Sequence, residues 1–113
     1  MTDTEAETLG RRLVACKGFR VMRGMLDMQG RTWGRDLLWR WRNDLDVPDL
    51  RDPATLGCLL TLVRGAWCDT RLSCVPWRLG WSVMRVWQNE SHGTVSAGDT
   101  EAEALVAALE AAP

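Results

Sequence analysis

The chain has few of the residues that most often carry out chemistry in proteins. It has one histidine, one lysine, one phenylalanine and no tyrosine. Its four cysteines form no Cys-x-x-Cys pair and stand at positions 16, 58, 68 and 74. Structural zinc needs closely spaced thiolate or imidazole ligands. The sequence therefore predicts no metal site, and because it has no glycine-rich phosphate loop it also predicts no cofactor.

The only histidine, His92, follows the polar residues Asn89-Glu90-Ser91, where composition predicts a turn that ends at Gly93. A histidine in a solvated turn is the expected outcome, because no second group is placed by spacing to complete a catalytic site. We identify no catalytic residue, and the chain is predicted not to be an enzyme.

Long apolar runs are also absent. None approaches the roughly 18 residues that a membrane-spanning helix needs, and the acidic start Met1-Thr-Asp-Thr-Glu-Ala-Glu7 does not resemble a secretory signal. We expect no membrane association and a cytoplasmic location. At 113 residues, the chain is long enough for one domain, residues 1–113, and too short for two independent cores.

Tryptophan and arginine are abundant instead. The chain has seven Trp, and all of its fourteen basic residues except Lys17 are Arg. Both residue types are enriched in interface hot spots. A GC-rich coding sequence would produce the same bias without selection for binding, so composition alone leaves both interpretations open.

Charge is segregated along the chain. Residues 11–88 hold all fourteen basic side chains and seven acidic ones, whereas the segments before and after them carry only acidic charge. The net charge of −1 thus hides a basic middle segment between acidic ends. Either sign could form an interaction surface.

Three helices are expected. Thr4 and Glu7 form a capping-box pattern that predicts a helix ending near Gly18, and Asp99-Thr-Glu-Ala-Glu103 repeats this start signal before an Ala-rich helix. Asp52 and Pro53 predict the start of a central helix. Its apolar stripe should cover a sheet, while Arg51, Thr55 and Arg64 face water. The expected stripe consists of Leu56, Leu59, Leu60, Val63 and Trp67.

Alternating residues predict strands between these helices. The clearest segment is 35–42, in which Trp39 and Trp41 alternate with Arg40 and Arg42. Further strands are expected over 19–27, over 77–88, with Leu79, Trp81, Val83 and Trp87 on one side, and over 94–97. The predicted fold is a single small layered α+β domain, with an antiparallel sheet of about four to five strands packed with two to three helices.

The candidate binding surface is basic. If Trp39 and Trp41 pack in the core, Arg40 and Arg42 point to solvent, whereas base stacking would require the indoles outside. Arginines on the neighbouring expected strands extend this surface. The candidate residues are Arg20, Arg23, Arg40, Arg42, Arg78 and Arg85.

Three segments carry a family resemblance: 12–26, 48–67 and 98–113, together with the strand that begins Trp81-Ser-Val. They resemble a group of small bacteriophage and prophage proteins similar to the phage α/β/α-sandwich domains. The resemblance implies a phage accessory protein in the host cytoplasm that acts by stoichiometric binding to a host protein, such as a CRISPR or restriction effector complex. A direct nucleic-acid-binding module and a non-enzymatic virion or morphogenesis component are the alternatives. The resemblance brings no catalytic residues.

Overall fold

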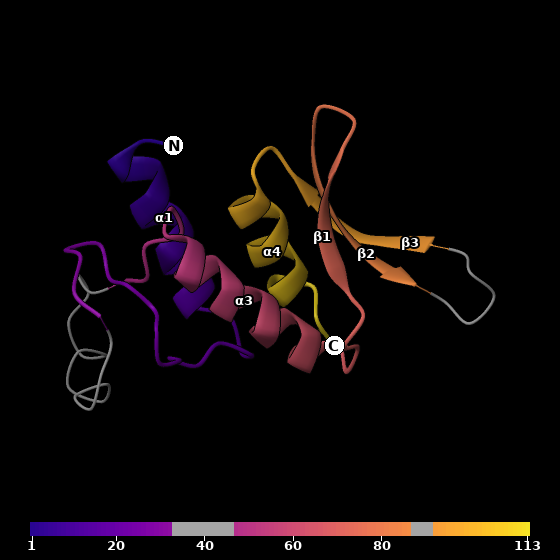
Figure 1. Cartoon of the computed structure of the whole chain (residues 1–113), viewed down its shortest axis with the longest axis horizontal. Coiled ribbons are helices and arrows are strands. Elements are labelled where there is room, and N and C mark those ends of the chain that lie inside the picture. Colours follow the sequence, from indigo (N-terminus) through magenta and orange to yellow (C-terminus); the bar gives the residue numbers. More distant parts are fainter. Residues whose placement is uncertain (33–46, 87–91) are drawn as a thin grey trace.

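The computed structural model describes residues 1–32, 47–86 and 92–113 (Figure 1). Within these ranges it contains three helices and one antiparallel sheet of three strands in the order β1-β2-β3. The elements are α1 (Asp3–Val14), α3 (Pro53–Ala66), β1 (Ser73–Trp77), β2 (Gly80–Val86), β3 (His92–Gly98) and α4 (Glu101–Glu110). The expected strand over 35–42 lies outside the described residues.

Side-chain caps fix the starts of the helices. Asp52 caps α3 and Pro53 opens it, as expected. Thr100 caps α4 by accepting the Glu103 amide at 3.1 Å, which confirms the start signal at residues 99–103. The predicted Thr4 cap of the first helix is wrong, because Thr2 and Glu5 form the capping box there. Gly18 does not end this helix either, since its C-cap is Ala15.

The predicted strand over 19–27 does not form. This segment makes turns and only two isolated bridges, at Leu26 and Asp27. Gly24 has a φ of +100°, which interrupts an extended strand. The Asp27 carboxylate accepts the backbone amides of Gln29 and Arg31, each at 2.9 Å, and so stabilises a turn instead of a sheet ladder.

The segment predicted as one strand over 77–88 contains a hairpin. Trp77 ends β1 and pairs with Gly80 of β2, which leaves a two-residue turn between them. The predicted return strand over 94–97 is confirmed within β3, which pairs with β2 through a bulge beside Val83 and Met84. His92 and Gly93, expected at the end of a turn, belong to β3 instead, and the rest of that expected turn lies outside the described residues.

Helix α4 lies between the sheet and the other two helices (Figure 1). It packs against all three strands on one side and against α1 and α3 on the other. The expectation that the central helix covers the sheet is therefore corrected, because α4 takes that place. The chain thus forms a compact α+β domain in which the described helices lie on one face of the sheet.

The core is formed by the helices and the inner face of the sheet. Leu59 and Val63 of the expected stripe are buried, as are Leu105, Val106 and Leu109 of the last helix. Leu56, Leu60, Trp67 and Trp81 are partly buried at the edge of the core, and Trp39 lies outside the described residues. The fully buried side chains include Leu13, Met25, Leu50, Leu59, Leu72, Leu105, Val63, Val83 and Val106.

The central helix is rotated relative to the expectation. Thr55, expected to face water, is fully buried, and Leu62 is buried as well. The Thr55 hydroxyl donates to Asp52 and accepts the Leu26 amide, both at 2.9 Å. Arg64, also expected in water, is half-buried, and its Nε donates to the Leu72 carbonyl at 2.7 Å. These hydrogen bonds satisfy the polar groups of Thr55 and Arg64, so this face of α3 can pack toward the core.

Candidate interaction surface

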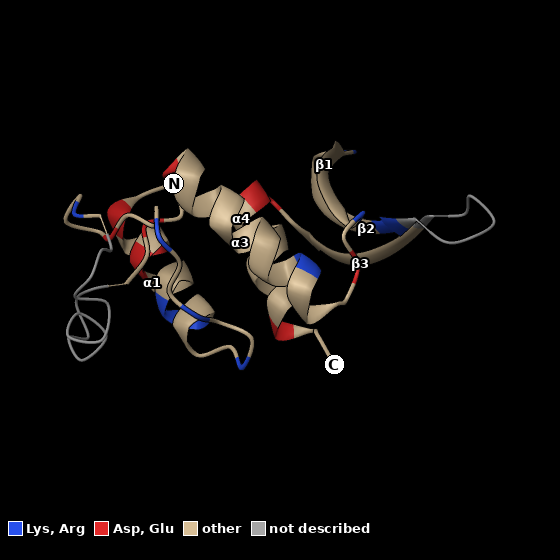
Figure 2. Ribbon diagram, turned by 60° about the horizontal axis from the view of Figure 1, so that its bottom comes forward, with Lys and Arg blue, Asp and Glu red and all other residues tan. Residues whose placement is uncertain are grey.

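The structure divides the candidate arginines between two regions. Arg20 and Arg23 are exposed in the segment after α1, in the helical part of the molecule, whereas Arg78 and Arg85 belong to the hairpin and the sheet (Figure 2). Because residues 19–27 form no strand of the sheet, these two pairs do not lie on neighbouring strands. Arg40 and Arg42 fall outside the described residues.

Arg85 is already engaged within the fold. Its Nε lies 3.1 Å from the Asp69 carboxylate, and its guanidinium carbon lies 5.5 Å from the centre of the Trp67 ring. The Trp67 indole donates to the Ala108 carbonyl of α4 at 2.9 Å. Hydrogen bonds from the Arg71 amide and then from Arg85 lower the pKa of Asp69. These contacts fasten the end of β2 to α3 and α4, so we assign Arg85 a structural role.

Arg78 occupies the tip of the β1–β2 hairpin, which projects beyond the rest of the sheet (Figure 1). Its φ is +55°, in the left-handed region where glycine is usual. Trp77 before it is 52% exposed, and Leu79 after it is fully exposed. The expectation that Leu79 shares a face with Trp81 and Val83 is wrong, because Leu79 lies in the turn.

A groove of about 640 Å³ runs beside this hairpin. It is lined by Trp77, Arg78, Leu79, Gly80, Trp81, Ser82, Thr94, Ala97, Gly98 and Asp99. Sequence reasoning missed this site because the alternating pattern continues through the turn. Pro76 and Gly80, which flank the tip, were the available signal for a hairpin.

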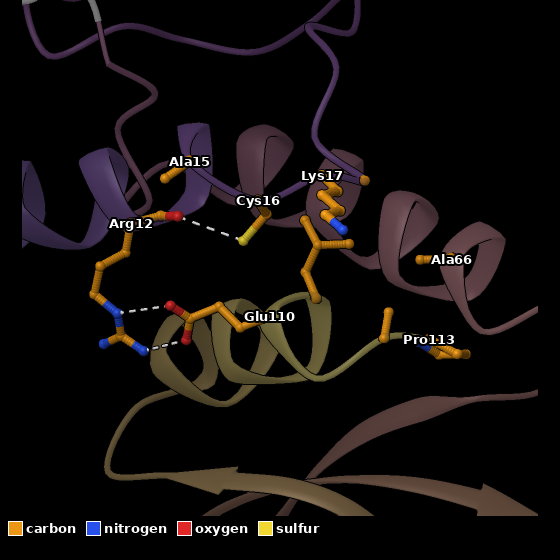
Figure 3. A pocket seen from close by; sticks show the side chains of 10 residues that line it. Arg12, Ala15, Cys16, Lys17, Ala66, Glu110 and Pro113 are labelled. Carbon is orange, nitrogen blue, oxygen red and sulfur yellow. Dashed lines mark hydrogen bonds and ion pairs between the residues drawn. The ribbon is translucent and has the colours of Figure 1, made fainter.

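A second hollow, of about 580 Å³, lies where α1, α3 and α4 end (Figure 3). Arg12 of α1 and Glu110 of α4 form an ion pair at 2.6 Å along its wall. The Cys16 thiol donates to the Arg12 carbonyl at 3.4 Å, and burial raises its pKa, so this thiol is a poor nucleophile. The hollow offers no activated group.

The segment around this hollow is basic. Residues 11–26 contain five basic side chains and no acidic one. Arg11 pairs with Glu7 at 2.8 Å, and Arg12 pairs with Glu110. No ion pair with a described residue engages the remaining three, which are exposed. They are Lys17, Arg20 and Arg23.

Residues 1–32, 47–86 and 92–113 include no cluster of three metal-ligating side chains. No helix in these ranges has the length and apolarity needed to cross a bilayer. Comparison with protein families, curated proteins and solved structures finds no match to this chain. The functional argument therefore rests on the surface and on the sequence segments described above.

Proposed function

We propose that this protein acts by stoichiometric binding to another protein and that the β1–β2 hairpin is its main anchor. The observation that carries this proposal is the exposure of Trp77 and Leu79 on either side of Arg78. Tryptophan and arginine are the residue types most enriched among interface hot spots. Trp77 and Arg78 are of these types, and together with the fully exposed Leu79 they make a compact anchor at one projecting turn.

Two energetic arguments support this role. Burying a fully exposed leucine against a partner contributes about 1.5–3 kcal/mol to the free energy of binding. The free protein gains nothing from this side chain. A left-handed backbone at a residue other than glycine costs about 1–2 kcal/mol, and Arg78 adopts it. Selection for folding alone favours glycine at such a turn. An arginine at this position supports a role in binding.

The resemblance to phage and prophage proteins supports a host protein as the partner. Within that class, we propose a defence effector such as a CRISPR or restriction complex. Binding without chemistry fits the described surface, where charged and apolar side chains are exposed and no catalytic constellation is assembled among the described residues.

Affinity capture with a double variant tests this function. Wild-type protein and Trp77→Ala/Leu79→Ser are immobilised separately and exposed to host-cell lysate, and the bound proteins are identified. We expect one host protein to bind the wild type and to be lost from the variant, with a 1:1 complex in sedimentation.

Arg20→Ala/Arg23→Ala is the matched control, because it changes two exposed residues away from the hairpin. Retention of the partner by the hairpin variant and its loss from the control would contradict the assignment of the anchor. Equal recovery from all three proteins would indicate nonspecific capture.

Direct nucleic-acid binding is the second candidate, and the exposed Lys17, Arg20 and Arg23, which form no ion pair with a described residue, favour it. Phosphate binding by these residues would make the affinity fall steeply with salt concentration. We expect only nonspecific binding of single-stranded and duplex oligonucleotides at about 150 mM salt. Submicromolar binding there, abolished by replacing all three with alanine, would replace the protein-binding proposal.

A further inference from the structure

The outer face of the sheet contains a buried hydroxyl group with no hydrogen-bond partner in the described chain. Ser82 is 4% exposed, yet no hydrogen bond joins its hydroxyl to any residue in 1–32, 47–86 or 92–113. Neighbouring side chains on a strand point to opposite faces. Because Val83 packs in the core beneath α4, Ser82 points outward, where it lines the groove beside the hairpin.

The neighbours of Ser82 set the shape of this groove. Ser82 pairs with Val75 on one side and with Ala97 on the other. Trp77 lies two residues beyond Val75, on the same face, and contributes aromatic surface to the lining. The small Ala97 is exposed. Ser82 thus supplies the buried hydroxyl of a partly aromatic groove, whose other hydroxyl, that of Thr94, belongs to an exposed residue.

This arrangement selects the chemistry of an occupant. A buried hydroxyl calls for a hydrogen-bonding partner, and a serine hydroxyl can both donate and accept. The charges at the groove are one of each sign, Arg78 and Asp99, which favours a neutral group over an ion. An aromatic ring with a hydroxyl at its far end can pack against the apolar lining and also form a hydrogen bond with Ser82.

We propose that this groove receives a tyrosine side chain of the partner protein, with its ring against Trp77 and Ala97 and its hydroxyl bonded to that of Ser82. This inference rests on the proposed protein-binding function. The chain itself has no tyrosine, so a second copy cannot supply the group. The tyrosine must come from a different protein.

Nuclear magnetic resonance of the ¹⁵N-labelled protein tests the groove without the partner. The probes are N-acetyl-tyrosinamide and N-acetyl-phenylalaninamide, which differ by one hydroxyl. We expect saturable shifts of the amides in residues 77–82 and 94–98, with a Kd of about 1 mM for the tyrosine probe. The phenylalanine probe should bind about tenfold more weakly, because it leaves Ser82 unpaired.

Two serine variants test the role of the hydroxyl. Ser82→Ala should abolish the tenfold difference between the probes, while Ser73→Ala, which makes the same change outside the groove, should preserve it. Trp77→Ala should weaken both probes. The amide spectrum of each variant reports whether it is folded.

Equal affinity of the wild type for both probes, or undiminished discrimination in Ser82→Ala, would overturn the proposal. Absence of saturable shifts up to about ten times the expected Kd would also overturn it. These results leave the hairpin anchor intact if Trp77→Ala/Leu79→Ser still abolishes capture. If Trp77→Ala/Leu79→Ser still captures the same partner as the wild type, while the wild type still discriminates between the probes, the proposed function is rejected instead.

Discussion

The two faces of the sheet belong to the same strands but differ in what covers them. On the inner face, Val83 is fully buried and the Ser96 hydroxyl donates to the Ala104 carbonyl of α4 at 2.7 Å. On the outer face, Thr94 and Ala97 are exposed and Ser82 lines a groove. The fold needs only the inner face for its core. Among the described elements, no helix packs on the outer face, where the proposed groove lies.

A pair of valines tests this difference most strongly. Val83→Ala should lower the free energy of unfolding by about 2–3 kcal/mol, because it removes two fully buried methyl groups and leaves a cavity. Val75→Ala makes the same change on the outer face, where the side chain is only partly buried, and should cost less than about 1 kcal/mol. Urea denaturation measures both. Equal losses would show that the outer face is also part of the core.

A pair of serines is expected to respond with opposite signs. Ser96→Ala should destabilise the protein by about 1 kcal/mol, since it removes a hydrogen bond to α4. Ser82→Ala removes a buried hydroxyl without a described partner and should stabilise it by about 1 kcal/mol. Thermal unfolding at one pH compares the two. Destabilisation of the Ser82 variant would mean that its hydroxyl is already satisfied.

The hairpin tip should gain stability when its arginine is removed. Arg78→Gly relieves the left-handed backbone and should stabilise the protein by up to about 1 kcal/mol while weakening capture of the partner. Arg71→Gly is the control, because Arg71 does not have a positive φ, and it should lose about 0.5–1 kcal/mol. If Arg78→Gly is the less stable of the two variants, the turn is not strained.

The inner face should also protect a thiol. Burial raises the pKa of Cys74 to about 11, so only about a hundredth of it is thiolate at pH 9. Alkylation by iodoacetamide at that pH, followed by peptide mass spectrometry, should label the exposed Cys68 well before Cys74. Faster labelling of Cys74 would indicate that α4 does not cover it.

The same thiol gives a pH dependence of stability. Its pKa is higher in the folded than in the unfolded chain, so the unfolded chain releases the proton first as the pH rises. The contribution of Cys74 is complete below about pH 9 and is lost as the pH rises toward 11. Cys74→Ala should flatten this alkaline loss in urea titrations.

The helix starts show how far local sequence signals reach. Asp-Thr-Glu-Ala-Glu occurs at residues 3–7 and at 99–103. In the second copy its threonine, Thr100, caps the helix as the pattern predicts. In the first copy, Thr2 stands three residues before Glu5 and forms a competing capping box two residues before the expected one. Two valid local signals overlap there, and the pattern alone does not rank them.

Side-chain direction and the hairpin were harder to predict. Thr55 is buried because Asp52 and the Leu26 amide satisfy its hydroxyl, and Leu26 is distant in sequence. Trp77 and Leu79 fit an alternating strand pattern that does not distinguish a strand from a turn within it. The elements with local signals were predicted, whereas the candidate site depends on pairings across the sheet.

The central position of α4 has a consequence for how the molecule opens. Helix α4 (Glu101–Glu110) packs against α1, α3 and all three strands. Most of these elements are far from α4 in the sequence. Separating the sheet from the helices therefore breaks long-range contacts together. Amide hydrogens of α1 and of β2 should accordingly exchange through a single shared unfolding event, with matching protection free energies, and the helical half has no independent subglobal opening.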